Sequence, residues 1–91
     1  MKDIIELREE INKTDCELVG LFKKRMALAA QVAEFKRENS LPVYDAERER
    51  ELLERIALMA GDEMREYALE LYSTVLDVSK KYQNEILDSE K

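Results

Sequence analysis

The chain has 91 residues, with 15 Lys plus Arg against 21 Asp plus Glu, no His and a single Cys. This length allows one small domain, and the formal charge of −6 argues against nucleic acid and anionic membranes as partners. Without His, and with one Cys, the chain lacks the commonest general base and the usual metal ligands, so any catalysis must proceed without them. The longest apolar run, residues 26–30, is too short to cross a membrane, and we expect a cytoplasmic protein.

The first part of the chain has the pattern of one very long helix. Apolar residues recur at three-residue and four-residue spacing from Ile4 to Phe35, and good helix formers fill the positions between them. Gly20 interrupts this stretch without any turn residues around it, so we interpret it as a close-packing site inside a continuous helix. The pattern predicts a first helix of about 35 residues and an all-α fold.

Two further helices are expected after the stop signal at residues 39–42, which read Asn-Ser-Leu-Pro. A short second helix is predicted to begin near Asp45 and to end at Gly61, a residue suited to a left-handed helix cap. A medium-long third helix follows from near Asp62 through Ile86. The expected architecture is therefore three helices per chain.

The length of the first helix predicts a dimer. At about 1.5 Å per residue, the helix is about 50 Å long, whereas a compact chain of this size has a radius of gyration of about 12 Å. The chain cannot cover the apolar stripe of such a helix by itself. We therefore expect an intertwined helical dimer.

Arg25 occupies a heptad position at which apolar residues are otherwise found, namely Ile4, Ile11, Leu18 and Val32. Lys36 lies eleven residues later, which returns it to within about 20° of the same face, about 16 Å along the axis. These two cations can converge on one small anion. Arg8 lies about 25 Å from Arg25 and about 100° around the helix, so it can share that anion only from a partner chain.

Polar residues also interrupt the later helices. Ser79 and Gln83 stand one turn apart on an apolar stripe, and Asp45 and Glu49 are one turn apart with Arg48 between them. Each feature has a structural interpretation, because a buried Arg can set register, Ser and Gln can bridge helices, and an Asp after Pro can cap a helix. Taken together, they favour a buried anion site.

This pattern resembles the all-helical chorismate mutases. The resemblance rests on residues 7–11 with Asp15, on Lys24-Arg25 with Val32 and Lys36, on residues 42–55, and on the last polar pair. It implies a single domain over residues 1–91, three helices per chain in an intertwined homodimer, and conversion of chorismate to prephenate in phenylalanine and tyrosine biosynthesis. The loop between the second and third helices is short by comparison with the family.

The resemblance also assigns the residues around the reacting bond. Arg25 and Arg8 of the partner subunit would bind the two carboxylates of chorismate. Lys36 and Gln83 would donate hydrogen bonds to the ether oxygen of the breaking bond and are the predicted catalytic residues. The rearrangement is unimolecular and needs no metal, nucleophile or redox cofactor.

The remaining predicted contacts hold the rest of the substrate. Glu49, with the backbone at Asp45, would hold the ring hydroxyl, and Ser79 would support a carboxylate. Arg48 lies outside the direct contacts and would orient Glu49.

Two alternatives stay open at this point. An isochorismate pyruvate lyase of the same fold also acts on a dicarboxylate with arginines and a lysine. A non-enzymatic helical dimerisation module would use Arg25 only to set register. The chain has no room for a prephenate-processing domain, and it can be a free-standing enzyme or a piece of a bifunctional one.

Overall fold

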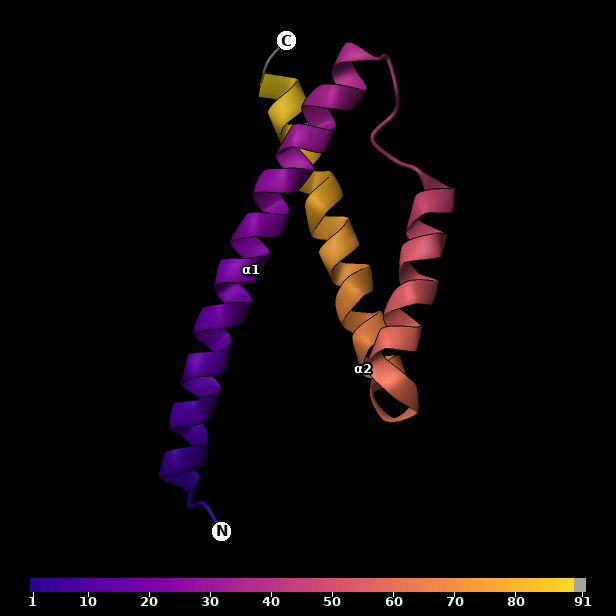
Figure 1. Ribbon diagram of the computed structural model, residues 1–91. Helices are drawn as coiled ribbons and strands as arrows, with labels where there is room; N and C mark the ends of the chain where they lie inside the picture. Colours follow the sequence, from indigo (N-terminus) through magenta and orange to yellow (C-terminus); the bar gives the residue numbers. More distant parts are fainter. Residues whose placement is uncertain (90–91) are drawn as a thin grey trace.

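The computed structural model describes residues 1–89 of the chain, and within this range it is helical, with no strand. Helix α1 spans Ile4–Glu38 and helix α2 spans Ala46–Ser89, and a connection over residues 39–45 joins them (Figure 1). Within the described part, no helix is long and apolar enough to span a membrane.

Helix α1 is 35 residues long, which confirms the predicted long first helix. Asp3 caps its start, because the Asp3 side chain accepts a hydrogen bond from the Glu6 N–H at 2.9 Å. At the other end Ser40 has a positive φ of 55°, and the Leu41 N–H donates to the Lys36 carbonyl at 2.7 Å. This is a Schellman-type ending, and it confirms the stop predicted at residues 39–42.

Helix α2 begins after Asp45, whose Oδ1 accepts a hydrogen bond from the Arg48 N–H at 3.1 Å. Gly61 has a φ of 78°, a backbone conformation that glycine adopts without strain, and the chain folds back on itself there. The prediction of three helices is therefore wrong: the described chain has two, α1 and α2. The reversal takes a single glycine, so no loop separates the predicted second helix from the third. We call residues 46–60 the first arm of α2 and residues 62–89 its second arm.

A small core lies between the two arms. Leu52 and Ile56 on the first arm and Leu76 on the second are buried together, and Leu53, Ala68 and Tyr72 pack against them. Helix α1 joins this hairpin near its own C-terminal end, where it crosses the second arm. Ala29 and Ala33 are buried on α1 near this crossing, and Ala33 has no exposed surface at all. Their small side chains allow the helices to approach closely.

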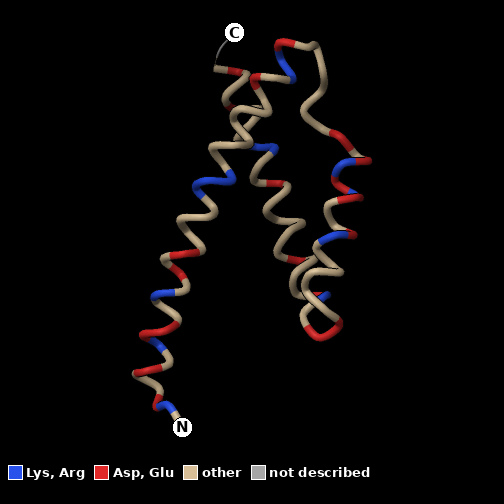
Figure 2. Tube along the Cα trace, in the orientation of Figure 1, with Lys and Arg blue, Asp and Glu red and all other residues tan. Residues whose placement is uncertain are grey.

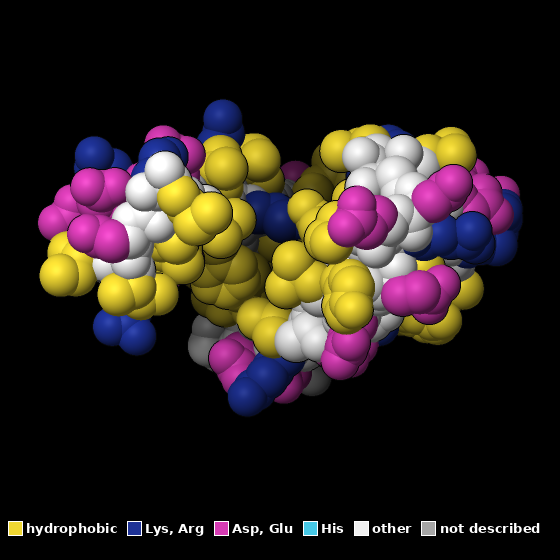
Figure 3. All heavy atoms as spheres, turned by 90° about the horizontal axis from the view of Figure 1, so that it is seen from below, with side chains coloured by type: hydrophobic (Ala, Val, Ile, Leu, Met, Phe, Trp, Pro, Cys, Tyr) yellow, Lys and Arg dark blue, Asp and Glu magenta, His cyan; other side chains and the backbone are white. Residues whose placement is uncertain are grey.

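Most of α1 is uncovered. Every residue from 1 to 24 is exposed, although the stretch carries the apolar positions that predicted the helix. A Cβ added at Gly20 would meet nothing within 4 Å, so the described part of the chain supplies no close packing there. The accessible area of 7461 Å² exceeds the value of about 5,500 Å² expected for a compact monomer of this size. Figure 3 shows a hollow between α1 and the α2 hairpin that is lined by hydrophobic side chains. We call residues 4–24 the uncovered segment.

Candidate active site

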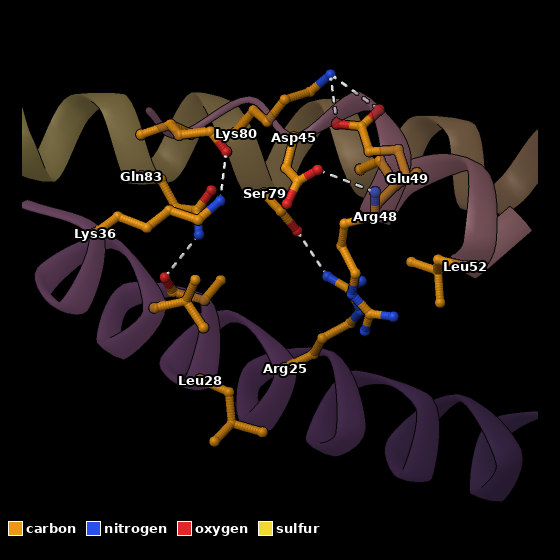
Figure 4. Close-up of a pocket in the computed structure, with 14 residues that line it drawn as sticks. Arg25, Leu28, Lys36, Asp45, Arg48, Glu49, Leu52, Ser79, Lys80 and Gln83 are labelled. Atoms are coloured by element: carbon orange, nitrogen blue, oxygen red, sulfur yellow. Dashed lines mark hydrogen bonds and ion pairs between the residues drawn. The ribbon is translucent and has the colours of Figure 1, made fainter. Parts of the chain in front are cut away.

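A cavity of about 310 Å³ lies where the C-terminal part of α1, the connection and both arms of α2 meet (Figure 4). This is the size of a small-molecule site. Its apolar walls come from Leu28, Ala29, Val32, Val43, Leu52 and Leu76. Its polar lining consists of Arg25, Lys36, Asp45, Arg48, Glu49, Ser79, Lys80 and Gln83.

The charge of this lining is positive although the chain as a whole is acidic. Among the described residues that line the cavity, four side chains are cationic and two are carboxylates, which leaves two positive charges in excess. The other acidic residues are spread along both helices (Figure 2). The cavity therefore suits a small dianion better than a cation or a neutral molecule.

Arg25 reaches from α1 to the second arm. Its Nη1 donates a hydrogen bond to Ser79 Oγ at 2.8 Å, and the Ser79 hydroxyl also lies 4.0 Å from Met26 Sδ. Ser79 is only 6% exposed, so this contact fixes the guanidinium from a buried anchor. An arginine has five N–H donors, and the neutral hydroxyl leaves its charge uncompensated. Arg25 can therefore bind a carboxylate without first breaking an ion pair.

Lys36 and Gln83 are held in a similar way by backbone carbonyl groups. Lys36 Nζ donates to the Val43 carbonyl at 2.7 Å, and Gln83 Nε2 donates to the Ala29 carbonyl at 2.8 Å. An ammonium has three N–H donors and a primary amide has two, so each group keeps at least one for a ligand. Gln83 is 7% exposed and Lys36 is half-buried, which limits competition from water.

The acidic side of the cavity comes from the first turn of α2. Asp45 is the N-cap of this helix, and its carbonyl also accepts the Glu49 N–H at 3.1 Å. Glu49 faces the second arm, where its Oε2 and Oε1 lie 3.0 Å and 3.4 Å from Lys80 Nζ. The hydrogen bond to Glu49 is the main reason that the pKa of Lys80 is raised above its usual value. Burial opposes this rise.

Six of the seven residues predicted to form the site line this one cavity. They are Arg25, Lys36, Asp45, Glu49, Ser79 and Gln83. Arg8 is the exception: it is exposed on the uncovered segment, seventeen residues and about 25 Å along α1 from Arg25. The described chain therefore brings together every predicted site residue except the one assigned to a partner chain.

Two cationic residues of the lining were not among the predicted contacts. Arg48, which the resemblance puts outside the direct contacts, lines the cavity, and Lys80, which it does not include, lines it as well. Helical spacing held a signal for both, because Arg48 lies one turn after Asp45 and one turn before Leu52, and Lys80 lies one turn before Gln83. A lysine next to a buried serine is nevertheless more often a solvated side chain than a cavity residue.

Comparisons with known proteins agree on one family. A family model described as chorismate mutase type II matches residues 7–84. The bifunctional chorismate mutase/prephenate dehydratase of Aquifex aeolicus is 41% identical over 56 residues, or 62% of this chain and 16% of that relative. The chorismate mutase of Methanocaldococcus jannaschii is 24% identical over 90 residues, covering 97% of this chain and 91% of that one.

A solved structure has the same fold. A conserved hypothetical protein from Pyrococcus furiosus aligns with a TM-score of 0.73 and 36% sequence identity, covering 88% of this chain and 93% of that chain. The present chain spans 16% of the length of the Aquifex aeolicus relative and 23% of the length of a bifunctional chorismate mutase/prephenate dehydratase from Buchnera aphidicola.

Proposed function

The chain belongs to the chorismate mutase type II family, and on that premise we propose that it catalyses the rearrangement of chorismate to prephenate. The family match confirms the resemblance drawn from the sequence motifs. The observation that carries the proposal is the cavity itself, in which six predicted residues and two excess positive charges surround a space of about 310 Å³. Chorismate is a small dicarboxylate, so its two negative charges match the two excess positive charges of this lining.

The reaction needs two contributions from the protein. One is a compact substrate conformation in which the two reacting carbons approach each other, and the other is positive charge near the ether oxygen as the bond breaks. Lys36 supplies this charge and Gln83 adds a neutral donor, because the remaining N–H groups of both can donate to that oxygen. The carbonyl groups of Val43 and Ala29 hold these donors in place before the substrate arrives, so little reorganisation is required.

The first contribution comes from groups at the other end of the cavity. Arg25, anchored on Ser79, binds one carboxylate, and Arg48 adds positive potential beside it. The Glu49 carboxylate accepts a hydrogen bond from the ring hydroxyl, and the backbone at Asp45 helps to hold the same hydroxyl. A substrate held at both ends of a small cavity has few extended conformations left, which favours the compact one.

The second carboxylate is bound by Arg8 of the partner subunit, in an intertwined homodimer. Three observations support this dimer: the uncovered segment, the hydrophobic hollow beside it, and a radius of gyration of 16.5 Å against about 12 Å for a compact chain. The excess exposed area of about 2,000 Å² per chain matches what each subunit of an obligate dimer buries. In such a dimer we expect α1 of the partner subunit to occupy the hollow and to bring its Arg8 to this site.

The name of the bifunctional relatives couples chorismate mutase with prephenate dehydratase, which supports a role in aromatic amino acid biosynthesis. The cytoplasmic location expected from composition stays a prediction.

Purified protein incubated separately with chorismate and with isochorismate tests the proposed function, with products identified by mass spectrometry. We expect prephenate from chorismate and no pyruvate release from isochorismate. Pyruvate release from isochorismate without prephenate formation would instead assign the lyase activity. No turnover of either substrate by folded dimer would favour the dimerisation module.

A further inference from the structure

The ion pair between Lys80 and Glu49 differs from the other cation contacts of the cavity. Arg25 and Lys36 are held by neutral oxygens, a hydroxyl and a carbonyl. Lys80 instead contacts both oxygens of a carboxylate, at 3.0 Å and 3.4 Å. Its charge is therefore already compensated before any substrate binds, and it is a poor candidate for holding a substrate carboxylate.

This pair also differs from ion pairs on the helix surfaces. The Lys80 and Glu49 side chains are 27% and 21% exposed, whereas the Lys2 and Glu10 side chains are 56% and 52% exposed. Glu49 lies on the first arm of α2 and Lys80 on the second, so the contact joins two segments that only the fold brings together (Figure 4). An ion pair that is partly shielded and joins two arms restricts both side chains more than an exposed one does.

Tyr44 also contacts the Lys80 ammonium. Lys80 Nζ lies 4.8 Å from the centroid of the Tyr44 ring, within range of a cation–π interaction. Asp77, one turn before Lys80, adds a longer contact at 3.7 Å. With an aromatic face and two carboxylates around it, the ammonium has a defined position, and Glu49 takes its orientation from it.

We propose that Lys80 is a positioning residue, which holds the Glu49 carboxylate at the cavity wall in the orientation that accepts the ring hydroxyl of chorismate. This inference rests on the proposed function. Lys80 itself does not touch the substrate. Its effect on binding passes through Glu49, and this separates it from Arg25 and Lys36.

A double-mutant cycle tests the proposal. Steady-state kcat and KM for chorismate are measured for wild type, Lys80→Met, Glu49→Gln and the double variant, with Lys81→Met as the matched control. Lys81 is the exposed neighbour of Lys80 and does not line the cavity. We expect Lys80→Met to raise KM about tenfold, the scale of one charged hydrogen bond, with a smaller change in kcat. Lys80→Arg, which keeps the charge, should recover most of this loss.

The decisive comparison is made in the Glu49→Gln background. If Lys80 acts through Glu49, Lys80→Met causes no further loss there, because the carboxylate it positions is already gone. A second loss of about tenfold would mean that Lys80 contacts the substrate directly, and the positioning role would be overturned. An unchanged KM in Lys80→Met would overturn it as well.

Two further measurements distinguish a folding defect from a loss of function in these variants. Circular dichroism checks each variant, and Lys80→Gln repeats the measurement if the methionine disturbs folding; a purely structural role would lower the active fraction and hence kcat, not raise KM. Wild-type and Lys81→Met protein without chorismate turnover would refute the proposed function. If wild-type turnover is normal but the effects of Lys80→Met and Glu49→Gln on KM add in the double variant, only the positioning role would be refuted.

Discussion

The two ends of α1 differ in what surrounds them. The C-terminal end crosses the second arm of α2, buries Ala29 and Ala33, and places Arg25 and Lys36 on the cavity. The uncovered segment carries the same kind of apolar stripe, and nothing within residues 1–89 buries it. One helix with one periodicity thus serves two purposes. The packed end builds most of a site, and the uncovered end, with Arg8, is the surface that we propose a second copy of the chain covers.

The largest expected effect comes from a charge placed on the uncovered segment. Leu18 is 56% exposed in the single chain but lies on the apolar heptad seam. Leu18→Glu should dissociate the dimer, because burial of an unpaired carboxylate costs several kcal/mol, and activity should be lost with it. Sedimentation velocity measures the oligomeric state.

The matched control is Asn12→Glu, which adds the same carboxylate at a polar position of the same segment. It should leave both the dimer and the activity intact. An active, dimeric Leu18→Glu variant would show that the uncovered segment does not form the interface, and the comparison between the two ends of α1 would fail.

The next effect concerns the packed end. Lys36→Ala should lower kcat by about 10²–10³-fold, the scale of one lost electrostatic donor, while the dimer persists. Lys81→Ala, which removes an exposed lysine of the second arm, is the control. Stopped-flow or steady-state assays of chorismate loss make this measurement. Turnover near the wild-type value would remove Lys36 from the mechanism.

The smallest effect is a pH dependence of stability. The pKa of Lys80 is raised above its usual value of 10.5, chiefly by its hydrogen bond to Glu49. The folded chain therefore holds this proton more tightly than the unfolded chain. The resulting stabilisation is complete below the unfolded pKa and is lost as pH rises through the higher folded pKa.

Urea unfolding at several pH values measures this contribution. The free energy of unfolding of Lys80→Met should fall short of wild type by a constant amount, below about 1 kcal/mol, between about pH 7 and 9, and the gap should shrink above about pH 10.5. Lys81→Met should show no such gap. A Lys80→Met gap that stays the same up to about pH 11 would contradict the role of the Lys80–Glu49 pair in stability.

Sequence periodicity was sufficient to predict helix α1 but not to predict that α2 is one helix. The spacing from Ile4 to Phe35 predicts the first helix because each apolar position repeats the helical turn. Gly61 was predicted as a helix end, and its positive φ agrees with that role. The prediction ended the second helix at Gly61 and began the third near Asp62, so a short reversal was expected, but it did not indicate that both would belong to one helix, α2, with Gly61 inside it. A glycine with positive φ is compatible with either arrangement.

The candidate site divides in the same way. Arg25 and Lys36 could be assigned to one face of α1 by arithmetic along one helix, and Ser79 and Gln83 stood out because they interrupt an apolar stripe. Helical spacing places Lys80 one turn before Gln83, but it does not reveal which residue Lys80 contacts. Its partner Glu49 is 31 residues away and reaches it only because α2 folds back at Gly61. Pairs formed by tertiary structure leave no local pattern.

The central claim is that each site takes Arg25 from one chain and Arg8 from the other. Arg8→Ala and Arg25→Ala dimers, each inactive alone, are mixed in equal amounts under conditions of subunit exchange, which native mass spectrometry verifies. Random exchange makes half of the dimers mixed, and each mixed dimer regains one of its two sites, so about a quarter of wild-type activity should return. No recovery despite verified exchange would contradict the shared site.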